Sequence, residues 1–166
     1  DGFRGLNQNI KEYFDQEHID DGPGSLLKTS YDYVDIDHAV KNLGDYDRLY
    51  CICGNESMKS ARDLALDDRV DTNIIGIAKT IFNDIPGLES IGFQTAVQEL
   101  ARYIDSAYIE ASSTNSIVFL EVPGRHNSGL TTHAGLARNS KITNVITPST
   151  RGDYRTSIEY SYGNRG

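Results

Sequence analysis

Two kinds of hydrophobic spacing alternate along most of this chain, and the alternation restricts its fold more than any other feature. Short apolar runs typical of buried strands occur at 49–53, 73–78, 116–122 and 142–147. Around them, apolar residues recur every three or four positions at 35–44, 58–66, 94–111 and 128–137, which predicts helices. Strands that alternate with crossover helices pair in parallel, so the pattern predicts an α/β fold with a doubly wound, mostly parallel sheet and helices on both faces.

The length of the chain, 166 residues, suits about one domain. We expect a single α/β domain over residues 1–149. Residues 150–166 form a separate, tyrosine-rich tail, in which Tyr154, Thr156, Ile158, Tyr160 and Tyr162 alternate with polar residues. This period of two is typical of an exposed strand, and a frayed polar terminus explains it equally well.

The acidic composition argues against a nucleic-acid partner. The chain has 16 Lys and Arg against 24 Asp and Glu, a net charge of −8, whereas binding to a phosphate backbone needs clustered basic residues. No apolar run approaches the roughly 18 to 20 residues that cross a bilayer, so we expect no membrane span.

The cysteines and the first residues bear on the compartment. Cys51 and Cys53 are too close in sequence for an ordinary disulfide, and buried thiols are typical of a reducing compartment. The first ten residues lack the basic and apolar regions of a secretion signal. We therefore expect an intracellular protein, in the cytoplasm or in an organelle after removal of a leader.

Three polar, glycine-bearing segments follow predicted strands. They are CGNES at 53–57, KTIFND at 79–84 and PGRHNSG at 123–129. In an open parallel sheet, ligands bind beyond the carboxyl ends of the strands. These segments are therefore expected to converge on one pocket.

An ordered set of motifs resembles the 6-phosphofructokinase family, which phosphorylates fructose 6-phosphate from ATP or pyrophosphate. The set comprises GFRGL, GSLLKTS, CGNESMKSA, GIAKTIFNDIPG, SIGFQTAV, EVPGRHNSG and HAGLAR, and it runs from about residue 2 to residue 148. The resemblance implies the fold of that family. It also implies a degenerate, truncated member that lacks the N-terminal phosphate loop and the C-terminal sugar-binding half.

Two motif positions depart from the residues that the resemblance implies for catalysis. Asn55 stands where the family has a metal-binding aspartate, and Glu56 places a carboxylate where a glycine lets phosphates approach. Phosphoryl transfer depends on neutralising developing negative charge, which this carboxylate opposes unless Glu56 itself binds the metal. Phe82 replaces the aspartate that accepts the proton of the sugar hydroxyl, and a phenyl ring cannot accept a proton.

Further departures lie outside these two motifs. Tyr31 replaces an arginine that reaches the nucleotide phosphates, Lys28 replaces a glycine in the same motif, and Ser149 replaces a glutamate that contacts the sugar. Thr80, Asn83 and Asp84 match the family, so Thr80, Asp84 and Arg125 are the retained candidates for a catalytic role.

A vestigial anion or sugar-phosphate site is the remaining binding prediction, and it comprises Lys79, Thr80, Thr95, Gly124 and Arg125. The alternative for Lys79 and Arg125 is a solvated or ion-paired side chain. His126 and His133 have no third ligand in view, so we expect caps or surface histidines instead of a metal site.

The leading hypothesis is a phosphofructokinase-like pseudoenzyme that serves as a structural or accessory subunit of a larger hetero- or homo-oligomer. It needs no cofactor. Two alternatives stay open. One is a fragment or subunit of a functional 6-phosphofructokinase, which would use Mg²⁺ with ATP or pyrophosphate, and the other is a sensor of a nucleotide or sugar phosphate.

Overall fold

The computed structural model of the chain describes residues 29, 34–44, 46–124, 127–142 and 144–147. The elements in these ranges are α2 (Ile36–Leu43), β1 (Arg48–Cys53), α3 (Asn55–Ala65), β2 (Asn73–Ala78), α4 (Phe93–Thr114), α5 (Gly129–Ala137) and the short 3₁₀ helix η2 (Asn139–Lys141). The chain divides into two compact units, residues 1–77 and 78–166.

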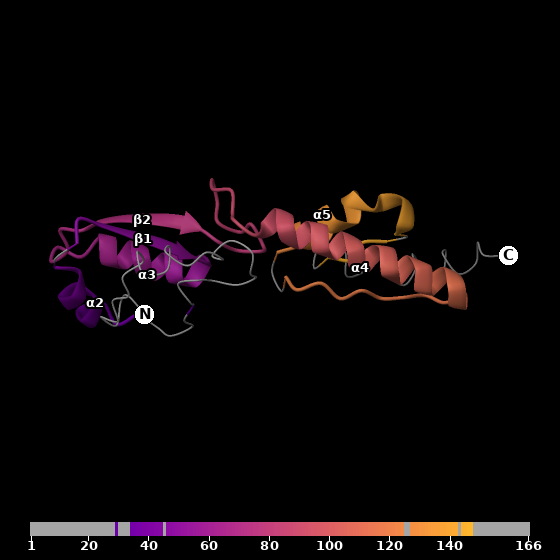
Figure 1. Cartoon of the computed structure of the whole chain (residues 1–166), viewed down its shortest axis with the longest axis horizontal. Coiled ribbons are helices and arrows are strands. Elements are labelled where there is room, and N and C mark those ends of the chain that lie inside the picture. The colour runs from indigo at the N-terminus through magenta and orange to yellow at the C-terminus, as the bar shows by residue number, and fades with distance from the viewer. Residues whose placement is uncertain (1–28, 30–33, 45, 125–126, 143, 148–166) are drawn as a thin grey trace, which may run out of the picture. The chain divides into compact units, whose positions relative to one another are not determined.

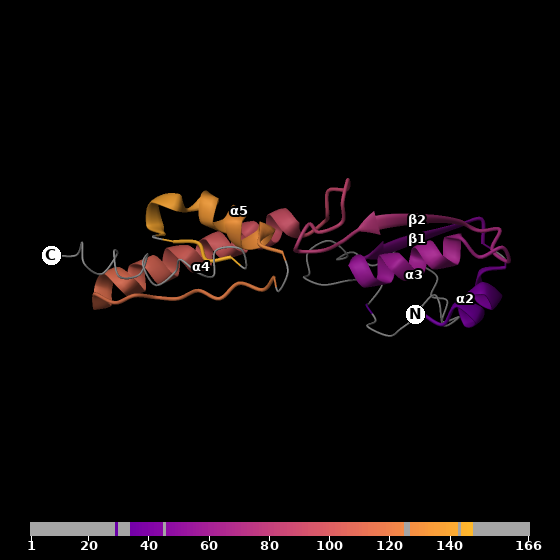
Figure 2. The ribbon, with the colours of Figure 1, turned by 180° about the vertical axis from the view of Figure 1, so that it is seen from behind.

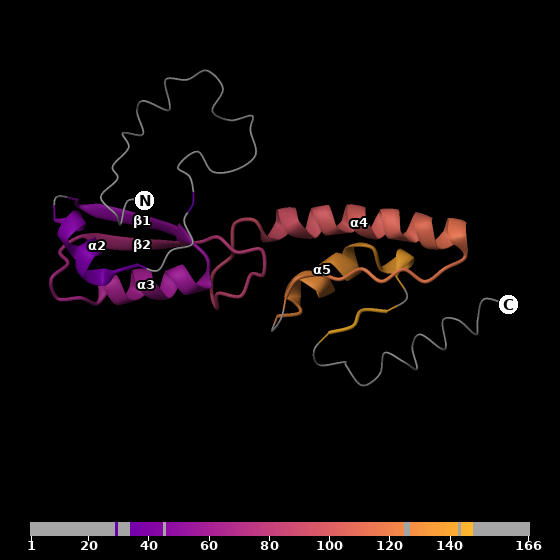
Figure 3. The same ribbon diagram turned by 90° about the horizontal axis from the view of Figure 1, so that it is seen from below.

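The first unit contains a β-α-β crossover. β1 and β2 are neighbours in a two-stranded sheet, and their arrows point the same way in Figure 3. Helix α3 connects them and runs back along the pair (Figure 1). A parallel pair needs such a crossover, so this unit confirms the α/β organisation that the alternation predicts.

A small apolar core holds α2 against α3. Ala39, Leu43 and Leu64 are buried, and Val40 and Ile74 pack against them. Helix α2 begins as the sequence predicts, because the Asp35 carboxylate accepts a hydrogen bond of 3.2 Å from the backbone N–H of His38.

Helix α3 approaches β2 closely at Gly76 of the strand. A Cβ atom on Gly76 would overlap the sulfur of Met58, which lies in the second turn of α3. The missing side chain leaves room for the end of the Met58 side chain against the strand.

The second unit is built on the 22-residue helix α4. Helix α5 packs along it, as Figures 1 and 2 show from opposite sides. The buried residues of this contact are Phe93, Ala101, Ile104, Leu130 and Ala134. Their spacings of three, four and eight positions place them on one face of each helix, and such spacing made both helices predictable from the sequence.

One carboxylate ties three elements of the second unit together. Asp105 of α4 accepts hydrogen bonds from Arg138 Nε at 3.0 Å and from Lys141 Nζ at 2.8 Å. These bonds hold the pKa of the Asp105 carboxyl below its ordinary value, with the Lys141 bond as the largest cause. The end of α5 and η2 are thereby fixed against α4.

Two predicted strands are absent from the described residues. The described residues of the segments 116–122 and 144–147 are not assigned to a strand, and the described sheet consists of β1 and β2. A strand forms only when a second backbone supplies its ladder, and no described segment does so here. The boundary predicted at 149/150 and the tail lie outside the described residues.

The described helices include none with the length and apolar character that would let it cross a membrane.

Candidate functional site

The KTIFND segment forms a loop whose two ends are tied together. Lys79 pairs with Ile91 in an isolated parallel bridge, and the N–H of Ile91 donates to the carbonyl of Ala78 at 2.9 Å. Residues 80–90 therefore leave the end of β2 and return beside it. Gly92 follows directly and begins α4 with a positive φ of 96°.

Thr80 organises the first half of this loop. Its hydroxyl donates to Asp84 Oδ1 at 3.1 Å and accepts from the backbone N–H of Phe82 at 3.1 Å. Both bonds are half-buried. One hydroxyl thus fixes the carboxylate of Asp84 and the backbone of Phe82 at the same time.

Asn83 organises the second half. It adopts a left-handed backbone conformation, with φ of 50°, and its Oδ1 accepts a hydrogen bond of 3.0 Å from the N–H of Ser90. Asparagine tolerates this conformation better than most residues. Ser90 is buried, and its own hydroxyl has no partner among the described residues.

The third motif segment is attached to the loop through Asn127. Its Nδ2 donates to the carbonyl of Phe82 at 3.3 Å, and its Oδ1 accepts from the N–H of Gly129 at 2.6 Å. The start of α5 therefore lies next to the KTIFND loop. Asn127 was not among the predicted site residues, although an asparagine directly before the predicted helix 128–137 indicates a local side-chain cap.

Phe82 offers no chemistry to the loop beyond packing. Its side chain is half-buried, and its backbone serves as donor to Thr80 and acceptor from Asn127. The retained Asp84 carboxylate is two residues away in sequence and is held by Thr80.

The predicted anion-binding residues are only partly brought together. Lys79 and Thr95 are exposed, Lys79 at the mouth of the loop and Thr95 in the first turn of α4. Gly124 is half-buried with φ of 149°, and the carbonyl oxygen of Asn127 leaves no room there for a Cβ. Arg125 and His126 lie outside the described residues, as do Lys28, Tyr31 and Ser149.

His133 lies in α5. It is exposed, and its Nδ1 lies 2.7 Å from the carbonyl oxygen of Gly129. The centres of the His133 and Phe93 rings are 5.1 Å apart, with the two rings nearly perpendicular.

The CGNES segment lies in the first unit, at the start of α3. Asn55 and Glu56 are exposed in the first turn, and the Glu56 carboxylate pairs with Lys59 Nζ at 2.8 Å. The hydrogen bond to Glu56 raises the pKa of Lys59. In the preceding strand, burial raises the pKa of the Cys51 thiol to about 11, with neighbouring Cys53 as a second cause.

A family model of phosphofructokinases matches residues 1–159 of this chain. The chain belongs to the phosphofructokinase family. It therefore has the α/β phosphofructokinase-like fold that the sequence analysis predicts.

Curated relatives agree with this assignment. The chain is 34% identical over 155 residues to an ATP-dependent 6-phosphofructokinase of Corynebacterium efficiens, an alignment that covers 86% of this chain and 44% of the relative. It is 33% identical to ATP-dependent 6-phosphofructokinase 1 of Arabidopsis thaliana, with 82% of this chain and 31% of that protein covered. The phosphofructokinase chain described here thus spans less than half the length of these relatives.

A magnesium ion, which phosphofructokinase chemistry implies, would find one carboxylate, that of Glu56, at residues 55–57. Asn55 supplies a neutral amide, and the carboxylate of Glu56 is already paired with Lys59. No cluster of three His, Cys, Asp or Glu side chains suitable for a metal occurs in the described ranges. Both side chains of the Glu56–Lys59 pair are exposed, so it is a surface ion pair of small energy.

Proposed function

We propose that this chain is a segment or subunit of a 6-phosphofructokinase-type phosphotransferase. The assembled enzyme would transfer a phosphoryl group from ATP or pyrophosphate to fructose 6-phosphate, and the rest of the site would come from further polypeptide. The observation that carries the proposal is the Thr80–Asp84 hydrogen bond of 3.1 Å. This bond holds the loop that contains Phe82, the residue that replaces the aspartate of the family.

The loop contributes orientation in this proposal. Thr80 holds the Asp84 carboxylate, Asn83 fixes the turn through Ser90, and Asn127 anchors the loop to α5. Positioned groups of this kind lower a barrier by holding reactants in register. Phe82 cannot accept the sugar proton, so the general base has to be another group of the assembled enzyme.

The relatives support the proposal through their names, which describe ATP-dependent 6-phosphofructokinases. Because the chain covers only part of each relative, activity is expected from an assembly that supplies the remaining part. The rate measured for the chain alone is the reference for the rate of the assembly.

An activity assay with paired variants tests the proposal. Phosphorylation of fructose 6-phosphate by ATP and by pyrophosphate is measured for the chain alone and with the proteins that copurify with it. Asp84→Asn should lower the rate by about 100-fold or more if the carboxylate takes part in the reaction. Glu89→Gln removes an exposed carboxylate from the same loop and should leave the rate unchanged.

A second candidate function is a non-catalytic accessory subunit, and Phe82 together with the paired Glu56 favours it. The combined variant Phe82→Asp, Asn55→Asp and Glu56→Gly restores the family residues at three positions. Phosphoryl transfer that appears only in this variant would indicate that the site of the natural chain has lost its catalytic activity. Absence of transfer in every sample, with stoichiometric copurification of a complex, would contradict the enzyme proposal and support the accessory role.

A further inference from the structure

One side-chain amide joins the motif loop, residues 79–91, to the start of α5. The Nδ2 group of Asn127 donates to the carbonyl of Phe82 at 3.3 Å, and its Oδ1 atom accepts from the N–H of Gly129 at 2.6 Å. Among the described residues, no other hydrogen bond connects this loop to residues 127–137. Asn127 is therefore the hydrogen-bonded link between the loop and the helix.

The two partners of this side chain require an amide. The carbonyl of Phe82 needs a donor at one end, and the N–H of Gly129 needs an acceptor at the other. A carboxamide group supplies both. An ionised aspartate has nearly the same shape but only accepts, so it would satisfy Gly129 and leave the Phe82 carbonyl without its partner.

The surroundings of the amide are close and half-buried. The backbone N–H of Asn127 donates to the carbonyl of Gly124 at 3.1 Å, which fixes the root of the side chain. A Cβ atom on Gly129 would lie 2.8 Å from Asn127 Oδ1 and 3.6 Å from the carbonyl oxygen of Phe82. Asn127, Phe82 and Gly129 are all half-buried. Loss of one partner would therefore leave a polar group poorly satisfied.

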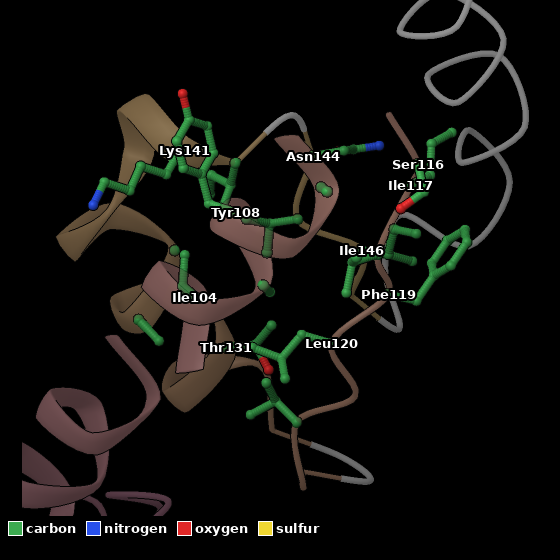
Figure 4. Close-up of a pocket in the computed structure, with 18 of the residues that line it drawn as sticks. Ile104, Tyr108, Ser116, Ile117, Phe119, Leu120, Thr131, Lys141, Asn144 and Ile146 are labelled. Carbon is green, nitrogen blue, oxygen red and sulfur yellow. The ribbon is translucent and has the colours of Figure 1, made fainter. Parts of the chain in front are cut away.

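The amide lies apart from the open groove of about 490 Å³ that Figure 4 shows in the second unit. The groove is lined by residues that include Ile104, Tyr108, Leu120 and Ile146, and neither Asn127 nor Phe82 is among them. A change at Asn127 should thus act on the motif loop and leave the groove as it is.

We propose that Asn127 is a positioning residue for the site of the proposed function, because its amide sets the place of the loop that carries Asp84. The Asp84 carboxylate is held by the hydroxyl of Thr80, which also accepts from the N–H of Phe82. The carbonyl of Phe82 is the group that Asn127 holds. A displacement of about 1 Å at a reacting group can lower a rate on the order of 100-fold. The effect on the reaction rests on the proposed function, whereas the hold on the loop does not.

Three variants of the whole chain separate the two ends of the amide. Asn127→Asp keeps the acceptor for Gly129 and removes the donor to Phe82, and a carboxylate at the start of a helix is favourable for α5. Asn127→Ser removes the same donor without adding charge, and it replaces the aspartate variant should that variant fail to fold. Asn139→Asp makes the same chemical change at an exposed position of η2 and is the matched control.

Hydrogen exchange read at single amides by NMR tests the hold on the loop. The amides of Phe82 and Ser90 should exchange about three- to tenfold faster in Asn127→Asp and Asn127→Ser, as the loss of one hydrogen bond predicts. The carbonyl carbon resonance of Phe82 should shift in the same two variants. The amides of α5, and every amide of the loop in the control, should keep their rates.

Two exchange results would overturn the proposal. Equal exchange of the loop in all proteins would show that the amide does not hold it. Equal acceleration in the loop and in α5 would show that Asn127 serves only the folding of the helix.

Kinetics of the assembled protein test the effect on the reaction. For the chain with the proteins that copurify with it, Asn127→Asp should lower kcat about tenfold and change the KM for fructose 6-phosphate by less than about twofold. An unchanged kcat in a variant whose loop exchanges faster would refute positioning and leave the enzyme proposal intact. Absence of transfer in every sample would overturn the proposed function instead, and the exchange rates would still decide whether Asn127 holds the loop.

Discussion

The hydroxyl of Thr80 makes two hydrogen bonds in the motif loop. It donates to the Asp84 carboxylate and accepts from the backbone N–H of Phe82. We expect Thr80→Val to destabilise the protein by about 1–3 kcal/mol, because a half-buried amide and a carboxylate lose their partner. Chemical denaturation measures the change, and exchange of the Phe82 amide should accelerate. Thr80→Ser keeps the hydroxyl and is the control. A valine variant as stable as the serine variant would contradict this role.

Two features exclude a side chain at Gly124. They are its φ of 149° and the nearby carbonyl oxygen of Asn127. Gly124→Ala should cost about 1–3 kcal/mol of unfolding free energy. Gly44→Ala is the comparison: its φ is −56° and nothing lies within 4 Å of an added Cβ. There we expect a change of about 1 kcal/mol or less, in the stabilising direction. Similar losses at both glycines would refute the steric explanation.

For single residues, the sequence predicted the members of the motif loop better than it predicted their hydrogen bonds. The motif pattern singled out Thr80, Asp84 and Phe82, and the structure places them in one hydrogen-bonded loop. Asn127 was missed because its bond to Phe82 spans 45 positions of the sequence. No local pattern specifies a partner so distant, whereas an asparagine cap at Gly129 is a local property.

Among the elements, α4 depends on Asp105 for its connection to α5 and η2. Hydrogen bonds from Lys141 and Arg138 lower the pKa of Asp105 from 3.8. A depressed carboxyl pKa contributes stability above the unfolded-state pKa, and this contribution is lost as the pH falls through the folded-state pKa. Asp105→Asn should therefore lower stability at about pH 7, and the difference from the unmodified protein should vanish on acidification to about pH 2.

Denaturation curves across this pH range measure the effect. Lys141→Met removes the partner that contributes most to the lowered pKa of Asp105. The fall in the stability of this variant at acid pH should therefore begin closer to the ordinary pKa of an aspartate. A difference between Asp105→Asn and the unmodified protein that stays constant with pH would show that charge plays no part.

The helices were predictable and two of the strands were not, for a physical reason. The amphipathic period of α4 and the Asp35 cap of α2 are local, and both helices form where the sequence predicts them. The segments 116–122 and 142–147 have strand-like composition, but pairing depends on a backbone elsewhere in the chain. Composition can therefore identify a segment that is able to pair without identifying its partner.

For the molecule as a whole, the two compact units have separate buried leucines, Leu64 in the first and Leu130 in the second. Leu64→Ala and Leu130→Ala should each cost about 2–5 kcal/mol in the stability of their own unit. Hydrogen exchange should then accelerate before residue 78 for the first variant and after it for the second. Uniform acceleration along the chain for either variant would mean that both units unfold in one cooperative step.

The contact between Gly76 and Met58 has an evolutionary consequence. Because a Cβ on Gly76 would overlap the sulfur of Met58, a larger residue at position 76 would require the Met58 side chain to move. Homologues that carry alanine or serine at the strand position should carry a shorter residue at the helix position. The two positions should thus vary as a pair, and laboratory selection for a compensating change after Gly76→Ala should recover substitutions at Met58.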